Sequence, residues 1–128
     1  MQLFGIGIDV VEVARIEQSI VEFGDRFLER IFTATEREYC QGQKHSELHY
    51  AARFAAKEAV SKAFGTGIGK DIAWLDLEVA RRPSGEPEMI LRGRAKAFAE
   101  ENNATVVKVS LTHAEHYAAA NAVVLSQS

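Results

Sequence analysis

Two acidic side chains stand where this sequence could bind a metal ion or handle a phosphate. Asp9 follows Gly5 and Gly7 at the end of an apolar stretch, and a carboxylate there is costly to bury unless it is paired or metal-bound. Its position also fits a second interpretation, in which Asp9 starts a turn and caps the helix behind it. Glu58 lies four residues before Lys62, so the two share one face of a helix. That spacing is also typical of an ordinary surface ion pair.

A glycine-rich loop, Gly65-Thr66-Gly67, follows the helix that carries Lys62. Together with the lysine ammonium, the backbone N–H groups of this loop could bind an anion. A glycine that caps a helix explains the same loop equally well. No Gly-Lys-Ser/Thr sequence follows a strand and opens a helix, so the loop is not a P-loop.

A histidine ends one of the alternating stretches near the C-terminus. His113 follows Ser110 and Thr112, and its side chain could hydrogen-bond a phosphate or transfer a proton near neutral pH. The alternative is an ordinary loop histidine, and His116 is available in the same way. The sequence leaves both interpretations open.

The side chains available to coordinate a metal favour magnesium over zinc. Cys40 is the only cysteine, and the sequence has no His-Glu-x-x-His motif, so a zinc site is not expected. Two carboxylates with few other ligands suit Mg²⁺, which keeps bound waters and uses phosphate oxygens of its substrate. Whether Asp9 and Glu58 meet in space depends on the fold.

Hydrophobic periodicity predicts the elements that must position these residues. Residues 3–11 read as a buried strand, and the glycines inside it indicate that another backbone or a ligand comes close. Residues 46–64 predict a long helix, with an alanine stripe that includes Ala59 and Ala63 and suits close packing on a sheet. The other predicted elements are helices at 12–23, from 33 to about 42, and at 93–102, and strands at 72–80, 88–91, 104–111 and 118–125. This order predicts an α+β fold with a mainly antiparallel sheet packed on a long central helix.

Length and composition indicate one ordinary domain over residues 1–128. Hydrophobic residues make up 47% of the chain and charged residues 26%, which permits a packed core and argues against disorder. The net charge of -3 argues against general nucleic-acid binding, which favours a basic domain. The single cysteine excludes an internal disulfide framework and fits a reducing compartment. The N-terminus lacks a basic region and no apolar run is as long as a membrane span, so we expect a cytoplasmic protein without a signal peptide.

Four segments together resemble one known family. They are GIGIDVVEVARIE (5–17), FLERIFTATE (27–36), RFAAKEAVSKAFGTGIG (53–69) and VSLTHAEHYAAA (109–120). They resemble the bacterial holo-acyl-carrier-protein synthases, which are small phosphopantetheinyl transferases, and the similarity runs nearly from end to end. The combination of G-x-D near the start, F-A-A-K-E-A-x-x-K-A and a G-T-G loop is specific. The resemblance implies a compact α+β domain that assembles as a homotrimer with active sites between subunits.

The resemblance also implies a reaction. The 4′-phosphopantetheine group of coenzyme A would pass to a serine of apo acyl carrier protein in fatty acid biosynthesis, giving holo acyl carrier protein and adenosine 3′,5′-bisphosphate. The serine hydroxyl would attack the phosphate that bears the pantetheine arm, and the proton acceptor is open between Glu58, a metal-bound water and His113. We favour Glu58 acting through or beside a water. A non-catalytic nucleotide-binding module and a Mg²⁺-dependent phosphohydrolase are the alternative functions.

Residue by residue, the resemblance implies a catalytic group and a coenzyme pocket. Asp9 and Glu58 match the family's Mg²⁺ ligands, and Lys62 matches a lysine placed near the phosphates. The residues that match the coenzyme A pocket are Lys62, Gly65, Thr66, Gly67, Pro87, Thr112 and His113. The turn before Pro87 is often Asn-Gly-x-Pro in the family, and Ser84 replaces the asparagine here, which puts an amide contact to the coenzyme in doubt.

Three arginines match positions that face the carrier protein in this family: Arg15, Arg26 and Arg30. Acyl carrier proteins are strongly acidic, so a local basic patch would steer them to an enzyme whose own net charge is negative. A solvated helix face is the alternative interpretation for these arginines.

Overall fold

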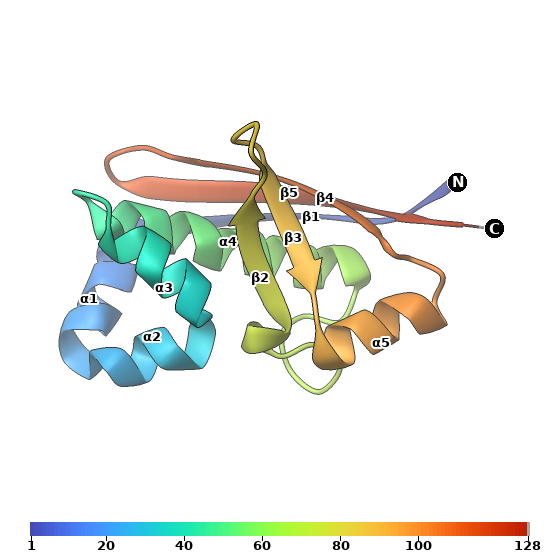
Figure 1. The fold of residues 1–128 in the computed structure, drawn as a ribbon, viewed down its shortest axis with the longest axis horizontal. Coiled ribbons are helices and arrows are strands. Elements are labelled where there is room, and N and C mark those ends of the chain that lie inside the picture. Colours follow the sequence, from blue (N-terminus) through green and yellow to red (C-terminus); the bar gives the residue numbers. More distant parts are fainter. Residues whose placement is uncertain (128) are drawn as a thin grey trace.

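One long helix, α4 (Ser46–Phe64), lies against a three-stranded antiparallel sheet (Figure 1). The computed structural model describes residues 1–127. The strands are β1 (Gln2–Glu12), β4 (Val106–His113) and β5 (Tyr117–Ser126), and β5 lies between the other two. Their register places Asp9 of β1 opposite Ala120 of β5, which lies opposite Leu111 of β4. This row fixes which side chains of the three strands are neighbours.

The contact between β1 and α4 is close because β1 has glycines where the helix crosses it. A Cβ atom at Gly5 would overlap the carbonyl oxygen of Ala63, and one at Gly7 would overlap the carbonyl oxygen of Ala59. The interpretation that another backbone approaches these glycines is therefore confirmed, and its partner is the alanine stripe of the long helix. This packing brings Asp9, two residues after Gly7, beside the C-terminal half of α4.

Three short helices pack at one end of the sheet, on the left in Figure 1. They are α1 (Val13–Phe23), α2 (Asp25–Ile31) and α3 (Ala34–Gln41). The sequence predicts the first and the third but no helix at α2, which with 7 residues is too short to show a helical period. A capping box begins α3, because the Thr33 N–H donates to Glu36 Oε1 at 2.8 Å and the Glu36 N–H donates to Thr33 Oγ1 at 3.3 Å.

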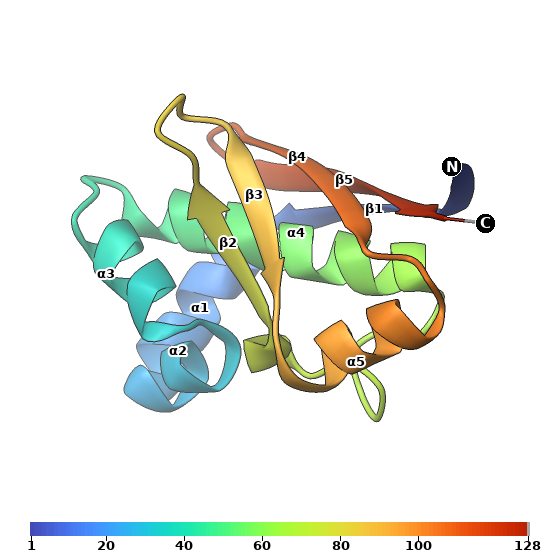
Figure 2. The same cartoon turned by 45° about the vertical axis from the view of Figure 1, so that its right-hand side comes forward.

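A second, two-stranded sheet crosses α4 (Figure 2). Its antiparallel strands are β2 (Leu77–Arg81) and β3 (Pro87–Leu91), and helix α5 (Gly93–Glu101) follows them. The strand predicted at 72–80 starts only at residue 77, because η1 (Trp74–Asp76) is a 3₁₀ turn in which the Ala73 N–H donates to Asp76 Oδ2 at 3.0 Å. The α+β class is confirmed, with two antiparallel sheets in place of one.

A buried ion pair ties the short helices and the second sheet to α4. The Lys57 ammonium donates to Glu36 Oε1 at 2.7 Å and to the carbonyl oxygen of Ile31 at 2.6 Å, and both charged side chains are fully buried. Glu36 Oε2 accepts the Val79 N–H at 2.7 Å, and Lys57 also donates to the carbonyl oxygen of Trp74 at 3.3 Å. Burial lowers the pKa of Lys57, and the adjacent Glu36 carboxylate opposes that effect.

The face of the three-stranded sheet that points away from α4 carries exposed apolar side chains. Ile6, Ile8 and Val10 alternate along β1 and are 67%, 66% and 61% exposed. They are the side chains of β1 that the alternation directs away from the helix. Within residues 1–127, no helix is long and apolar enough to cross a membrane.

Candidate active site

Asp9 and Lys62 form the centre of the candidate site. Lys62 lies near the C-terminal end of α4, and its ammonium donates to Asp9 Oδ1 at 3.0 Å and to the carbonyl oxygen of Ile8 at 3.1 Å. Asp9 does not cap a helix, because α1 begins after Glu12 and no side chain caps it. The capping interpretation of Asp9 is therefore wrong, and its partner is the lysine.

Glu58 lies one helical turn before Lys62 on the same face of α4. Burial raises the pKa of the Glu58 carboxyl, the negative charge of Asp9 raises it further, and Lys62 opposes both effects. Asp9 and Glu58 therefore lie close enough to interact within one chain. In the described residues Lys62 pairs with Asp9 and not with Glu58, so the surface ion pair that the spacing alone suggests is not the arrangement found.

These two carboxylates limit which ion the site could hold. Across residues 1–127, no cluster of three or more His, Cys, Asp or Glu side chains could bind a metal. An ion shared by Asp9 and Glu58 would take its other oxygens from water and phosphate, which suits Mg²⁺ and not a structural zinc ion. The raised pKa of Glu58 fits such an ion, because a cation between two like charges relieves their repulsion.

The loop after α4 is folded back onto the helix. Gly65, with φ of 83°, caps the helix as predicted, and its N–H donates to the carbonyl oxygen of Lys62 at 2.9 Å. The N–H groups of Thr66 and Gly67 both donate to the carbonyl oxygen of Ser61, at 3.2 and 3.1 Å. The interpretation that these N–H groups are free to bind an anion is therefore wrong. The Lys62 ammonium is the donor that this end of the helix presents.

A second group of polar side chains lies toward the other end of α4. The His113 ring, at the end of β4, lies 5.0 Å from the His49 ring on α4, and the His49 ring lies 5.8 Å from the Tyr39 ring on α3. The guanidinium groups of Arg53 and Arg81 lie over the Tyr39 ring, at 4.3 and 5.4 Å from its centroid. We call these five residues the histidine cluster.

The histidine cluster has the chemistry of an anion site. Arg53 is only 2% exposed, and its Nε has no hydrogen-bond partner among the described residues, which is costly for a buried donor. Burial lowers the pKa of His49, and His113, Arg53 and Arg81 lower it further because each disfavours another positive charge. The side chain of His116, by contrast, is 77% exposed, so only His113 of the two candidates belongs to this group.

Sequence reasoning finds His113 but not the other members of the histidine cluster. His49 and Arg53 are four residues apart on α4, the same helical spacing that draws attention to Glu58 and Lys62, so a local signal was present. Tyr39 and Arg81 have no such signal, because they come from α3 and β2 and meet only through tertiary packing.

One chain does not bring the histidine cluster to the carboxylates. His49 and Glu58 are nine residues apart on one straight helix, which corresponds to about 13 Å along its axis. His113 packs on His49, so it lies toward the same end of α4. The two groups could act on one ligand only if it spans both, or if a second chain supplies one of them.

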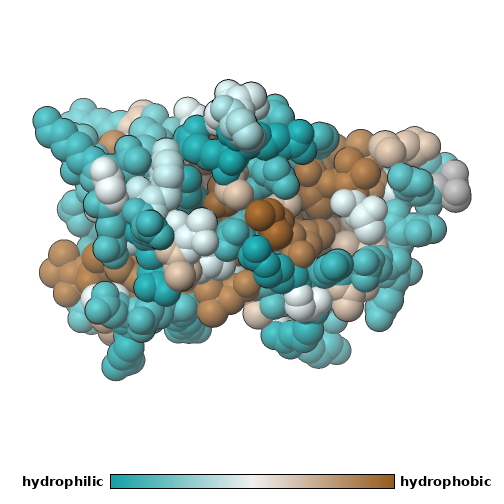
Figure 3. Space-filling view, in the orientation of Figure 1, coloured by the Kyte–Doolittle hydropathy of each residue, from teal (hydrophilic) through white to brown (hydrophobic). Residues whose placement is uncertain are grey.

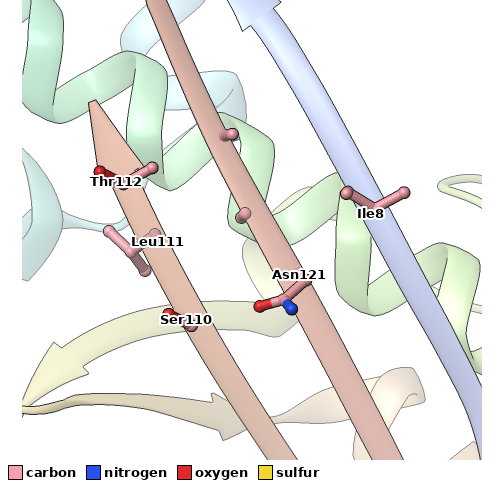
Figure 4. Close-up of a pocket in the computed structure, with 7 residues that line it drawn as sticks. Ile8, Ser110, Leu111, Thr112 and Asn121 are labelled. Carbon is pink, nitrogen blue, oxygen red and sulfur yellow. The ribbon is translucent and has the colours of Figure 1, made fainter. Parts of the chain in front are cut away.

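Thr112 and Pro87 also lie apart from Asp9 in the fold, one on the opposite face of the sheet and the other in the second sheet. Thr112 lies with Ser110 and Asn121 on the open face of the sheet, where they line a shallow pocket of about 160 Å³ (Figure 4). Asp9 points to the opposite face, toward α4. Pro87 begins β3 of the second sheet and lines a separate pocket of about 100 Å³.

The arginines expected to face a carrier protein lie on α1 and α2. Arg26 and Arg30 line a cavity of about 340 Å³ together with Phe23 and Phe27, so cationic and apolar groups share one surface. The side chain of Arg15 is 77% exposed and lies 3.8 Å from Glu12. Apolar atoms also gather over the α1 end of the molecule in Figure 3.

Comparisons with known proteins agree on one family. A sequence model described as the 4′-phosphopantetheinyl transferase superfamily matches residues 5–122. A holo-[acyl-carrier-protein] synthase of Koribacter versatilis is 47% identical over 121 residues, which are 94% of this chain and 97% of the relative. A crystal structure of a holo-(acyl-carrier-protein) synthase from Bacillus anthracis in complex with CoA (3′,5′-ADP) is 39% identical, covers 99% of this chain and 100% of its own, and has a TM-score of 0.83. The synthase structure from Neisseria meningitidis is 30% identical, covers 98% of this chain and 100% of its own, and has a TM-score of 0.92.

Proposed function

The chain belongs to the 4′-phosphopantetheinyl transferase superfamily, and we propose that it acts as a holo-[acyl-carrier-protein] synthase. It transfers the 4′-phosphopantetheine group of coenzyme A to a serine of apo acyl carrier protein and leaves adenosine 3′,5′-bisphosphate. Its product serves fatty acid biosynthesis, and residues 1–128 form one transferase domain. The observation that carries the proposal is the meeting of Asp9 and Lys62 beside Glu58, from elements far apart in the chain.

In this proposal Asp9 and Glu58 hold a Mg²⁺ ion with the diphosphate of coenzyme A. When bound, the ion neutralises charge that builds on the phosphate oxygens during transfer. Lys62 orients Asp9 through its 3.0 Å contact and presents a positive charge at the same place. The two carboxylates and the lysine, which come from a strand and a helix, could therefore bind a diphosphate together with a hard cation.

Glu58 is the side chain best placed to accept the proton of the carrier serine. The serine oxygen bonds to the phosphorus that bears the pantetheine arm, and the bond from that phosphorus to the bridging oxygen breaks. The leaving group is adenosine 3′,5′-bisphosphate, and the proton passes to Glu58 directly or through a water. Its place one helical turn from Lys62, where its charge interacts with that of Asp9, supports this role. His113 packs on His49, which lies about 13 Å from Glu58 along the axis of α4, so we propose that it would act from a neighbouring subunit.

The chain assembles as a homotrimer with its sites between subunits. The exposed apolar side chains Ile6, Ile8 and Val10 form a surface that another copy would cover. The separation of the histidine cluster from Glu58 supports the same arrangement. A neighbouring copy would bring its own histidine cluster to the carboxylates, so one coenzyme could contact both groups through its phosphates.

The acidic carrier docks on α1 and α2 in this proposal. Arg15 projects into solvent, and Arg26 and Arg30 line the cavity that also contains Phe23 and Phe27. The chain has a net charge of -3, so most of its surface does not attract an acidic carrier protein. A local positive patch would therefore orient the carrier as it approaches.

The test is a mass spectrum of an apo acyl carrier protein after incubation with the protein, coenzyme A and Mg²⁺. A transferase adds the mass of one phosphopantetheinyl group to the carrier, and chelating the metal prevents the addition. A binding module would leave the carrier unchanged although coenzyme A binds. A phosphohydrolase would release phosphopantetheine with no carrier present, and either of these results would refute the proposal.

A further inference from the structure

The buried pair of Lys57 and Glu36 is a connection that the proposed reaction does not use. Lys57 is the residue before Glu58, and consecutive residues point about 100° apart around a helix. Glu58 therefore stays partly accessible at the candidate active site, while the Lys57 side chain is fully buried. Apolar side chains of similar size often stabilise a core at least as well as a buried ion pair, so this pair calls for a role other than stability.

The Lys57 ammonium has three donors, and they meet three different segments. One donates to the carbonyl oxygen of Ile31, the last residue of α2, at 2.6 Å. The others donate to Glu36 Oε1 on α3 at 2.7 Å and to the carbonyl oxygen of Trp74 in η1 at 3.3 Å. The C-terminal end of a helix presents unpaired carbonyl groups and a partial negative charge, so a cation at Ile31 is well placed. One side chain of α4 thus holds α2, α3 and η1.

The Glu36 carboxylate makes this junction directional. Its Oε1 accepts the Thr33 N–H at 2.8 Å as well as the Lys57 ammonium, and its Oε2 accepts the Val79 N–H at 2.7 Å. Apolar side chains also pack around α2 and α3, but apolar contact has no preferred direction, whereas a hydrogen bond weakens steeply with angle. The buried pair therefore sets how α2 and α3 are oriented on α4.

The fixed end of α2 adjoins the arginines proposed for carrier docking. Arg30 is the residue before Ile31, and Arg26 lies one turn earlier; both are accessible and line the same cavity. A hydrogen bond of 2.6 Å from Lys57 to Ile31 thus joins the sequence neighbours of a docking arginine and of the proposed proton acceptor, Glu58. The backbone of α2 otherwise packs mainly on α1 and η1, so this bond is a direct link between α2 and α4.

We propose that the buried pair of Lys57 and Glu36 positions a docked carrier protein relative to Glu58, an inference that rests on the proposed function. The carrier binds the outer side of α2, and its serine must then reach the reacting phosphorus beside Glu58. A misplacement of about 1 Å can cost about a hundredfold in rate, so the orientation of α2 matters for the reaction. Both charged side chains are fully buried and contact neither substrate, so they are positioning residues.

Removing both charges at once separates positioning from stability. Glu36→Gln/Lys57→Met keeps the side-chain volumes and leaves no unpaired buried charge, so its thermal midpoint should stay within about 5 °C of the wild type. Its kcat for carrier modification should fall about tenfold or more, because the serine is presented less accurately. Calorimetric binding of coenzyme A should stay within about twofold of the wild-type Kd.

The docking arginines show whether this loss passes through α2. In a chain that carries Arg26→Ala and Arg30→Ala, the carrier loses its contacts with α2, so the orientation of that helix no longer matters. Adding Glu36→Gln/Lys57→Met to this chain should lower kcat/KM by about twofold or less. A pair that only supports the fold would lower kcat/KM by the same factor in both backgrounds, and that result would overturn the proposal.

The ion pair of Glu78 and Arg92 provides the matched control. It joins β2 to the residue after β3 at 3.1 Å, and the Glu78 side chain is 9% exposed. Glu78→Gln/Arg92→Met removes two opposite charges in the same way, and its kcat should equal that of the wild type. An equal loss of kcat in this control would show that any such change slows transfer, which would also overturn the proposal.

Glu36→Asp provides the test if the double variant does not fold. It keeps the charge opposite Lys57, but its shorter side chain cannot reach Lys57 and Val79 as Glu36 does. With a wild-type circular dichroism spectrum, its kcat should fall about threefold or more at an unchanged coenzyme A affinity. Wild-type kcat in either folded variant, or an equal loss of coenzyme A binding, would refute the positioning role. A wild-type protein that modifies no carrier would instead refute the proposed function, and this reaction is measured before any variant is compared.

Discussion

The charge of Asp9 can be removed without changing the shape of its side chain. Asp9→Asn keeps an oxygen near Lys62 but removes the negative charge, so the ion and the lysine both lose a partner. We expect Mg²⁺-dependent transfer to fall about a hundredfold or more, which corresponds to several kcal/mol of lost charge stabilisation. The measurement is the initial rate of carrier modification at saturating coenzyme A.

Glu115→Gln is the matched control for Asp9→Asn. It also replaces one acidic group by an amide, but the Glu115 side chain is 87% exposed in a turn and touches neither carboxylate of the site. Its transfer rate should equal that of the wild type. Near-wild-type transfer by a folded Asp9→Asn variant would sink the metal assignment.

His49 links the stability of the fold to pH. Its folded pKa is lowered by burial and by His113, Arg53 and Arg81, with only Glu47 opposing them. A histidine whose folded pKa lies below its unfolded value of about 6.5 is fully stabilising above that value, and the stability is lost as pH falls through the lowered folded pKa. The free energy of unfolding in urea should therefore decrease from about pH 7.5 to about pH 5.

A variant that lacks the titrating His49 side chain should lose less stability as the pH falls. His49→Gln should show a smaller decrease in unfolding free energy over the same pH range, because glutamine cannot take up the proton. His45→Gln is the control, since the His45 side chain is 61% exposed and should leave the wild-type slope in place. Identical slopes for the wild type and His49→Gln would mean that this histidine is not held neutral by its neighbours.

Residue types identify candidates, and only the fold tells which candidates meet. Asp9, Glu58 and Lys62 are recognisable from carboxylates and a lysine at helical spacing, but the bond between Lys62 and Asp9 requires β1 to cross α4 at one register. The N–H groups of the loop at Thr66 were expected to be free for an anion, and this expectation is wrong for a related reason. The last carbonyl groups of a helix need donors, and the N–H groups of the loop donate to them.

The crossing of β1 and α4 is the element contact on which the site depends. Gly7→Ala should destabilise the fold by about 1–3 kcal/mol or more, because the added methyl group meets the Ala59 carbonyl oxygen and backbone cannot move aside easily. The displaced strand should also separate Asp9 from Lys62 and lower transfer. Thermal unfolding and transfer rate measure the two effects.

Gly42 offers the matched control. A Cβ at Gly42 would find its nearest atom, the Tyr39 carbonyl oxygen, at 3.5 Å, and the residue has a right-handed helical φ of -77°. Gly42→Ala should therefore keep both stability and transfer near the wild-type values. If Gly7→Ala behaved as Gly42→Ala does, the close approach of strand and helix would be wrong.

Long elements with a repeated hydrophobic pattern are predictable from this sequence, and short elements are not. Helix α4 and strand β1 follow from alanine spacing and an apolar run with glycines. Helix α2 has only Leu28 and Ile31 buried, so no repeat marks it, although Asp25 in its first turn and Arg30 in its last suit the helix dipole. The split into two sheets depends on long-range pairing that no local pattern contains.

One face of the molecule exposes several large apolar side chains. Ile6, Ile8 and Val10 lie on one face, with Asn121 and Ser110 among the residues of the adjoining pocket (Figure 4). Such a face is typical of an interface between subunits. If the chain assembles as the proposed homotrimer, its sedimentation mass should correspond to three chains, and Ile8→Asp should reduce it to one, because the aspartate would be buried without a partner.

A trimer with shared sites makes a further prediction about mixtures of inactive variants. Asp9→Asn removes a carboxylate, and His113→Ala removes part of the histidine cluster; if these groups meet across subunits, some sites in mixed trimers contain neither defect. Random assembly of equal amounts should make about one quarter of the sites intact, so co-refolded mixtures should recover up to that fraction of wild-type transfer. Each variant refolded alone is the control. If both are inactive alone and the mixture remains inactive, with mixed trimers verified by mass spectrometry, the site must lie within one chain.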